Sequence, residues 1–212
     1  MKQVDINFLS SNYWNDKYKI GDIRWDIGAP TPIFSDWINK QNTKLNICVL
    51  GAGNGWDAVN FAKNGHEVTA VDFAQKAVNN MANLAKKEKI NLKILKLDIF
   101  RLKDFYSNYF DVIVEYTCFC AIHPKDRIRY IELVNKILKP GAQLVALFFP
   151  LNVDRNKDSG PPFSIDLNEV RSEFSRYFNL ISDNYHKLSI KPRENREKLL
   201  IFKKHECKNS IK

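Results

Sequence analysis

Short runs of branched apolar residues alternate along the chain with longer segments in which apolar positions recur every three or four residues. The short runs predict strands buried on both faces, as in a parallel sheet, and the longer segments predict amphipathic helices. Alternating strands and helices indicate an α/β fold. Strands are expected at 47–50, 67–71, 92–97, 110–116, 142–149, 180–190 and 198–203, and helices at about 10–20, 32–40, 58–62, 73–89, 125–139 and 169–178.

Three glycines at alternate positions follow the first expected strand, and an acid ends the second. The glycines are Gly51, Gly53 and Gly55, and Asp72 lies 21 positions after Gly51. Glycine permits positive φ and lets a ligand approach the bare backbone. An acid at the end of the second strand can accept both hydroxyls of a ribose. We therefore favour a nucleotide-type site at the carboxyl edge of the sheet over a tight turn without a ligand.

The glycine spacing indicates which nucleotide-type ligand to expect. The pattern is G-x-G-x-G, not the G-x-G-x-x-G that dinucleotide folds use to place a pyrophosphate at a helix N-terminus. This difference disfavours a dinucleotide oxidoreductase. It favours S-adenosylmethionine, which contains a ribose and an adenine but no phosphate.

The ends of the third and fourth strands are expected at the same edge. Asp98 and Ile99 follow the third strand, where they are placed to meet an adenine; a helix cap explains Asp98 equally well. The crevice of an open α/β sheet lies beyond its first and fourth strands, so residues 115–120 are expected to line a reaction chamber. Cys118 and Cys120 with His123 make a poor zinc set, and we expect no metal.

Aromatic residues are dense before the first strand. Trp14 and Tyr18 are four positions apart and would share one helix face, and Trp25 follows in a Gly/Pro-punctuated loop. As a lid over the cofactor, such rings would gain about 0.5–2 kcal/mol from a sulfonium cation. Simple packing of an N-terminal arm on the sheet is the alternative, and the residues alone favour neither.

Two further features point to the substrate. Residues 150–168 form a polar, punctuated segment, which we interpret as a lid that places Phe163 over the site. Arg127 falls at the start of a helix, where the helix dipole prefers acids, so it is a candidate for holding an anion or a substrate. A surface ion pair with Asp126 or Glu132 is the more common role for such an arginine.

Composition narrows the class of protein. The chain has 212 residues, no apolar run long enough for a bilayer, and four cysteines without a C-x-x-C pair. We expect a single cytoplasmic domain without a membrane partner. Of the net charge of +9, residues 187–212 contribute +6, from nine Lys/Arg and three Glu. We favour a solvated basic tail over a nucleic-acid surface, because aromatic residues are not interleaved with these charges.

Several stretches together resemble the thiopurine methyltransferase superfamily, and its thiol/halide ("harmless to ozone layer") branch in particular. They are Trp-Asp-Ile-Gly-Ala-Pro-Thr-Pro (25–32), Leu-Gly-Ala-Gly-Asn-Gly-Trp-Asp (50–57), Val-Asp (71–72), Glu-Tyr-Thr-Cys-Phe-Cys-Ala-Ile-His-Pro (115–124), Leu-Lys-Pro-Gly (138–141), Gly-Pro-Pro-Phe (160–163) and Pro-Arg-Glu-Asn-Arg-Glu-Lys-Leu (192–199). Tyr18 and Glu115 depart from the branch, which usually has tryptophan and aspartate at these positions.

The resemblance implies a Rossmann-like, seven-stranded class I methyltransferase that uses S-adenosylmethionine without metal, with a mostly parallel sheet and helices on both faces. The expected parts are an N-terminal aromatic lid (1–40), a cofactor-binding core (45–150), a substrate lid loop (150–168) and a C-terminal helix with closing strands (169–212). Expected cofactor contacts are Trp14, Tyr18, Trp25, Gly51, Gly53, Asp72, Phe73, Asp98, Ile99 and Tyr116. Expected substrate contacts are Trp25, Phe119, Arg127 and Phe163, with Tyr116 and Arg127 as catalytic residues.

The expected reaction is methyl transfer to a small soft nucleophile: a thiol, sulfide, halide, thiocyanate or thiopurine. Such a nucleophile needs alignment and a dry chamber more than a general base, which agrees with the absence of a Ser-His-Asp or Cys-His set from the motifs. We expect a monomer that acts on a small-molecule thiol or anion. The alternatives are a small-molecule N- or O-methyltransferase, which needs a base such as Glu115, Tyr116 or His123, and a basic, cofactor-sensing RNA-binding protein.

Overall fold

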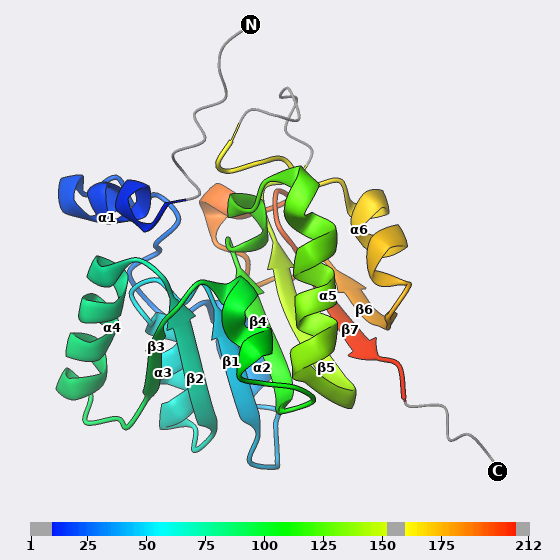
Figure 1. Cartoon of the computed structure of the whole chain (residues 1–212), viewed down its shortest axis with the longest axis horizontal. Coiled ribbons are helices and arrows are strands. Elements are labelled where there is room, and N and C mark those ends of the chain that lie inside the picture. The colour runs from blue at the N-terminus through cyan, green and yellow to red at the C-terminus, as the bar shows by residue number, and fades with distance from the viewer. Residues whose placement is uncertain (1–9, 152–159, 207–212) are drawn as a thin grey trace, which may run out of the picture.

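The protein is a seven-stranded sheet covered by helices on both faces (Figure 1), as a computed structural model shows for residues 10–151 and 160–206. The strand order is β3-β2-β1-β4-β5-β7-β6. The strands are β1 (Asn46–Leu50), β2 (Glu67–Asp72), β3 (Lys93–Lys96), β4 (Phe110–Tyr116), β5 (Leu138–Phe148), β6 (Phe178–Asn184) and β7 (Lys198–Lys204). The expected Rossmann-like α/β class is confirmed.

Six strands run in one direction, and β7 runs against them. β1 pairs in parallel with β2 and β4, and further parallel pairs join β2 to β3 and β4 to β5. β7 is antiparallel to both β5 and β6, so the predicted antiparallel closure is confirmed. Because of its direction, β7 begins at the edge of the sheet where β4 and β5 end.

Each face of the sheet has its own apolar core, and alternate residues of β1 contribute to both. Ile47 and Val49 join the core under α2 (Pro32–Ile38) and α3 (Trp56–Lys63). Cys48 and Leu50 join the core on the opposite face, which also contains residues of the helices 127–137 and 167–174. The remaining helices are α1 (Ser11–Ile20), α4 (Gln75–Lys87), α5 (Arg127–Ile137) and α6 (Leu167–Phe174).

Some expected boundaries were wrong. The expected turn at 139–141 lies inside β5, where Gly141 has φ 73° and the register with β4 shifts between Phe110 and Val112. Phe178 begins β6 rather than ending a helix, and β6 stops at Asn184 instead of residue 190. Thr31 does not cap α2 with its side chain, because that hydroxyl is bound to Asp57.

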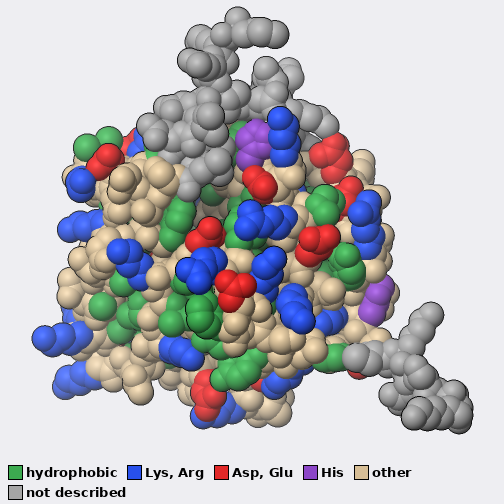
Figure 2. Space-filling model, viewed as in Figure 1, with side chains coloured by type: hydrophobic (Ala, Val, Ile, Leu, Met, Phe, Trp, Pro, Cys, Tyr) green, Lys and Arg blue, Asp and Glu red, His purple; other side chains and the backbone are tan. Residues whose placement is uncertain are grey.

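Charged side chains of both signs are mixed on the surface of the protein. On the face shown in Figure 2, Lys and Arg side chains are interspersed with Asp and Glu rather than gathered in one stripe. Within the described ranges, no helix combines the length and the apolar character that a bilayer crossing requires. The end of the basic tail, 207–212, lies outside the described residues.

Candidate active site

The glycine loop after β1 is joined to the end of β2 through a buried carboxylate. Asp72 is 9% exposed, and its two oxygens accept hydrogen bonds from the backbone N–H of Gly53 (3.0 Å) and of Ala74 (2.9 Å). Burial raises the pKa of Asp72, and these backbone donors act in the opposite direction. The carboxylate is therefore held at the carboxyl edge of the sheet, directly beside the loop.

Bare backbone at Gly53 allows an aromatic side chain to approach the loop. Gly53 has φ 57°, and a Cβ atom there would lie 3.2 Å from the hydroxyl oxygen of Tyr18. Burial raises the pKa of Tyr18, with a further contribution from the charge of Asp72. Gly51 lies against Cys118, whose Sγ would be 2.9 Å from a Cβ at that position. The predicted residues Tyr18, Gly51, Gly53 and Asp72 therefore lie together at the carboxyl edge of the sheet.

The three aromatic residues predicted as a lid form one cluster. The ring of Trp25 meets those of Trp14 and Tyr18 edge-on, with centroid distances of 5.2 and 5.6 Å. Its indole N–H donates to the Tyr18 hydroxyl at 3.4 Å. A polar contact from the α1 residue Asn15 to the backbone N–H of Lys76 (2.9 Å) joins α1 to the start of α4. Because Tyr18 also approaches Gly53, the cluster lies beside the glycine loop.

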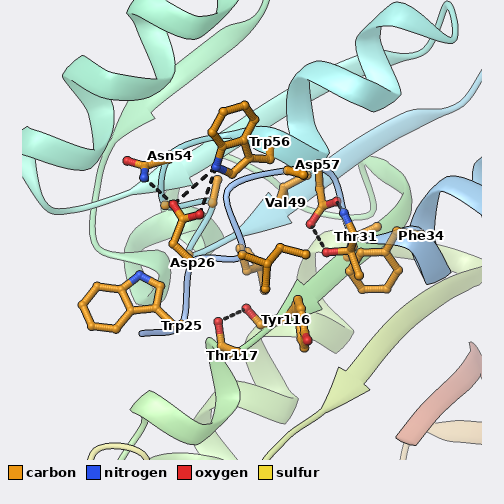
Figure 3. A pocket seen from close by; sticks show the side chains of 17 residues that line it. Trp25, Asp26, Thr31, Phe34, Val49, Asn54, Trp56, Asp57, Tyr116 and Thr117 are labelled. Atoms are coloured by element: carbon orange, nitrogen blue, oxygen red, sulfur yellow. Dashed lines mark hydrogen bonds between the residues drawn. The ribbon is translucent and has the colours of Figure 1, made fainter. Parts of the chain in front are cut away.

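Two acids that the sequence analysis did not single out hold the N-terminal loop in place (Figure 3). Asp26 accepts hydrogen bonds from Asn54 Nδ2, from Trp56 Nε1 (3.1 Å) and from the backbone N–H of Gly28 (2.6 Å). Asp57 accepts from the backbone N–H and the hydroxyl of Thr31, at 2.7 and 2.8 Å. An acid two residues before a glycine is a turn signal that could have indicated Asp26.

A cavity lies between this loop and the ends of β1 and β4 (Figure 3). Four residues predicted for the site line it, namely Trp25, Gly51, Gly53 and Tyr116. Most other lining side chains are apolar or already hydrogen-bonded within the protein. The remaining lining residues are Asp26, Ile27, Ala29, Thr31, Phe34, Val49, Leu50, Ala52, Asn54, Trp56, Asp57, Val114 and Thr117.

Three predicted substrate residues form a separate cluster that does not line this cavity. Phe119 is 2% exposed and packs edge-on against Tyr130. Arg127 places its guanidinium carbon 4.8 Å from the centroid of the Phe119 ring and donates to the carbonyl oxygen of Ser164 at 3.0 Å.

The third residue of this cluster, Phe163, is fully buried, and its backbone N–H donates to the carbonyl oxygen of Cys120 at 2.7 Å. The alternative ion pair of Arg127 with Asp126 or Glu132 is not formed among the described residues. Residues 152–159 of the expected lid loop lie outside the described residues. The substrate role of the three residues stays a prediction.

The residues predicted to meet the adenine lie at the Asp72 edge. The backbone N–H of Leu97 donates to the carbonyl oxygen of Asp72 at 3.1 Å, which brings the end of β3 beside the end of β2. Asp98 is exposed and caps a short 3₁₀ helix by accepting from the backbone N–H of Phe100 at 3.0 Å. Ile99 packs against the core, and Phe73 is half-buried. Their contacts with a cofactor stay predictions.

Tyr116 belongs to a buried polar network that spans distant parts of the chain. Its hydroxyl donates to Glu197 Oε2 at 2.5 Å, and the guanidinium carbon of Arg193 lies 4.8 Å from the centroid of its ring. Arg193 also donates to the carbonyl oxygen of Trp25 at 2.7 Å. Arg193 and Glu197 are 5% and 2% exposed. Charged residues just before a strand resemble a solvated loop, so the sequence analysis assigned them no role.

The donor set fits an adenosyl cofactor better than a metal. The loop offers bare backbone, Asp72 offers carboxylate oxygens for ribose hydroxyls, and the aromatic cluster offers ring faces for a cation. No group of three His, Cys, Asp or Glu within the described ranges could hold a metal ion. Burial raises the pKa of the thiols of Cys118 and Cys120, which keeps them in the protonated form that does not bind metals.

Comparisons with known proteins agree with this site. The family model for thiopurine S-methyltransferase matches residues 9–207. The chain is 30% identical over 201 residues to a probable thiol methyltransferase 2 from Arabidopsis thaliana, with 92% of this chain and 86% of that protein covered. It is 27% identical to thiocyanate methyltransferase 1 from Brassica oleracea, with 90% and 84% covered. A thiopurine S-methyltransferase from Legionella pneumophila (strain Corby) is 24% identical, with 77% and 80% covered.

Solved structures show the same fold. A 1,6-didemethyltoxoflavin-N1-methyltransferase from Burkholderia thailandensis, solved with S-adenosylhomocysteine, superposes with a TM-score of 0.76 at 18% identity, covering 94% of this chain and 88% of that one. A magnesium protoporphyrin IX methyltransferase from Synechocystis, solved with its methyl donor, gives 0.64 at 13% identity, covering 96% and 86%. Together with the family match, these findings show that the chain belongs to the thiopurine S-methyltransferase family and is an S-adenosylmethionine-dependent methyltransferase.

Proposed function

We propose that this enzyme methylates the sulfur or halide atom of a small soft nucleophile, with thiols, sulfide and thiocyanate ahead of halides and thiopurines. The observation that carries the proposal is the agreement between a family match over 9–207 and relatives named for thiol and thiocyanate methylation. The predicted order follows the higher identity of the thiol and thiocyanate relatives, 30% and 27% against 24% for the thiopurine enzyme.

The character of the cavity supports this class of acceptor. Its wall is mainly apolar side chains and loop backbone, and its acids Asp26 and Asp57 already accept hydrogen bonds from neighbouring groups. A thiolate or thiocyanate becomes a strong nucleophile once it is stripped of water, so such a wall favours reaction. An amine or alcohol depends on a general base to lose its proton, whereas thiocyanate and an ionised thiol react without one.

In this proposal each group of residues has a separate task. The glycine loop and Asp72 hold the adenosyl part of the cofactor, while Trp14, Tyr18 and Trp25 cover it. S-adenosylmethionine, when bound, supplies an electrophilic methyl group on a sulfonium. Tyr116 contacts the acceptor in the cavity. Arg127, beside Phe119, is the candidate for holding an anionic acceptor.

A panel of acceptors with isotopically labelled S-adenosylmethionine tests the proposal. The panel contains an alkyl thiol, sulfide, thiocyanate, iodide, a thiopurine, an aromatic amine and a catechol. We expect label transfer to at least one sulfur acceptor and a ratio of at least tenfold over the amine and the catechol.

Two controls separate binding from chemistry. Titration calorimetry with S-adenosylhomocysteine shows whether the preparation is competent to bind the product form of the cofactor. Cofactor binding with transfer only to nitrogen or oxygen acceptors would contradict the proposal and favour an N- or O-methyltransferase.

A further inference from the structure

Glu197 is a buried carboxylate that the proposed reaction has not yet used. It accepts two hydroxyl hydrogen bonds, from Tyr116 to Oε2 and from Ser189 to Oε1, each 2.5 Å long. Distances of 2.5–2.7 Å are typical of a hydroxyl that donates to an ionised carboxylate. No Lys, Arg or His in the described part of the chain forms an ion pair with Glu197. Its carboxylate is therefore hydrogen-bonded to two hydroxyl groups, one of which belongs to a residue of the cavity wall.

The direction of β7 explains why this acid reaches the active edge. Glu197 directly precedes β7, and Lys198 at the start of β7 pairs with Phe148 at the end of β5. Tyr116 ends β4 and pairs with Leu147 of β5. An antiparallel β7 thus places Glu197 at the carboxyl edge of the parallel strands, with only β5 between its strand and that of Tyr116. A parallel β7 would place it at the opposite edge.

Tyr116 connects this acid to the cavity. The residue lines the cavity, and its hydroxyl is hydrogen-bonded to Glu197. The uncharged side chain of Phe34 packs edge-on against the Tyr116 ring, with 6.0 Å between centroids. The charged groups that act on Tyr116 are Arg193 and Glu197. Burial is the main reason that the pKa of Tyr116 is raised well above its usual range. A neutral tyrosine cannot take a proton unless it passes its own proton on at the same time.

We propose that Tyr116 and Glu197 form a proton relay that removes the proton from a thiol acceptor. This inference rests on the proposed function. The S–H bond breaks, the proton moves to Tyr116 Oη, and the tyrosine hydroxyl proton moves to Glu197 Oε2. The electron pair left on the thiol sulfur forms the new bond to the methyl carbon. The pair of the broken methyl–sulfonium bond stays on the cofactor's sulfur, which becomes a neutral thioether. Glu197, now neutral, later releases its proton to solvent.

The relay predicts a difference between acceptors that carry a proton and acceptors that do not. Thiocyanate has no proton to lose at neutral pH, so it needs no relay. An alkyl thiol of the cysteine type has a pKa of roughly 8.5, so only about 3% of it is thiolate at pH 7. Without the relay, the enzyme is limited to that fraction, which corresponds to a loss of about 30-fold in the rate with the thiol.

The experiment compares wild type with Glu197→Gln at pH 7 and pH 9, on the alkyl thiol and on thiocyanate. We expect the ratio of the thiol rate to the thiocyanate rate to fall about 30-fold at pH 7 and less than threefold at pH 9, where most of the thiol is already ionised. Calorimetry with S-adenosylhomocysteine is expected to give an affinity within threefold of wild type, which gives a readout that does not depend on turnover.

Two matched variants sharpen the test. Glu194→Gln makes the same substitution three positions away on an exposed side chain, and we expect no change in the ratio. Tyr116→Phe removes the hydroxyl between the thiol and Glu197, so it is expected to lower the ratio as Glu197→Gln does. Because the two groups act as one unit, the double variant is expected to be no worse than either single variant.

The possible outcomes separate this inference from the proposed function. Equal losses on thiol and thiocyanate would show that Glu197 only maintains the structure, and no loss on either acceptor would also overturn the relay. A wild-type enzyme that methylates neither acceptor while it binds S-adenosylhomocysteine would instead overturn the proposed function. A selective thiol loss that is recovered at pH 9 supports the relay.

Discussion

The two sides of the active edge are built in different ways. We call the glycine loop and Asp72 the cofactor side, because we propose that they hold the adenosyl part of the cofactor; they and the N–H groups bound to Asp72 all lie within residues 46–74. We call Tyr116, Arg193 and Glu197 the acceptor side, because we propose that they act on the acceptor; Tyr116 meets Glu197 across 81 positions, and Arg193 meets the carbonyl of Trp25 across 168 positions. The cofactor side is therefore a local feature of one β-α-β unit, whereas the acceptor side exists only after the whole sheet has formed.

This difference concerns chemistry as well as sequence distance. The cofactor side relies on backbone conformation and one acid, which are requirements that a short motif can encode. The acceptor side relies on charged side chains whose value depends on burial: Arg193 and Glu197 would be ordinary surface charges in an isolated segment. Changes on the cofactor side are thus expected to alter binding and folding, and changes on the acceptor side to alter selectivity and pH dependence.

The largest effect is expected from Asp72→Ala. If the carboxylate accepts both ribose hydroxyls, its loss removes two hydrogen bonds to a charged acceptor, each contributing about 1.5 kcal/mol. The expected result is an affinity for S-adenosylhomocysteine about 100-fold weaker by titration calorimetry.

Because Asp72 also accepts from Gly53 and Ala74, thermal unfolding of Asp72→Ala and Asp72→Asn accompanies this measurement. A folded Asp72→Ala variant with an affinity within threefold of wild type would contradict the ribose assignment.

An effect of similar size, on stability, is expected from Gly55→Ala. Gly55 has φ 85°, and a Cβ there would lie 2.4 Å from Cγ of the fully buried Met81. The left-handed conformation costs a non-glycine residue about 1–2 kcal/mol, and overpacking adds about 1–3 kcal/mol. We expect the free energy of unfolding in urea to fall by about 3 kcal/mol.

Gly65→Ala is the matched control for this prediction. Gly65 has nearly the same φ, 87°, but a Cβ there would meet nothing within 4 Å. It isolates the backbone cost, for which we expect about 1 kcal/mol. Equal losses at the two positions would show that Met81 moves aside without cost and that the contact does not constrain the loop.

The smallest effect is expected from Glu115, near the end of β4. Glu115 is 1% exposed and accepts from the backbone N–H of Phe119 at 2.8 Å, and burial raises its pKa to about 7. The folded state therefore holds this proton up to a higher pH than the unfolded state, whose carboxyl titrates near 4.3. The stability from the bound proton is complete below about pH 4.3 and is lost as the pH rises to about 7.

Glu115→Gln is expected to remove this part of the pH dependence. Between pH 5 and pH 8 the variant should become more stable relative to wild type, with its free energy of unfolding rising by on the order of 1 kcal/mol against that of wild type. Glu132→Gln, on an exposed side chain of α5, is the control and should show no such trend. Parallel curves for wild type and Glu115→Gln would contradict a buried, proton-binding carboxyl.

Much of the fold follows from local pattern, and the errors have identifiable causes. The strand 110–116 was predicted to the residue, because the apolar residues of a buried parallel strand dominate it, with Val112–Val114 at its centre. The turn predicted from Lys139-Pro140-Gly141 was wrong, because β5 pairs with β4 on both sides of it, at Leu138 and from Gln143 onward, with an irregularity between that contains the positive φ of Gly141. Pairing with a neighbouring strand is a tertiary contact, which turn propensity alone does not include.

The sequence by itself determined the α/β class, the glycine loop with its acid and the aromatic N-terminal segment, because each depends on residues close together in the chain. Only the tertiary structure decided that Asp26 and Asp57 anchor the N-terminal loop, that Arg127, Phe119 and Phe163 form a cluster apart from the cavity, and that Glu197 reaches Tyr116. The physical reason is that burial and strand direction set the partners and charges of these side chains, and neither is a property of a local stretch of sequence.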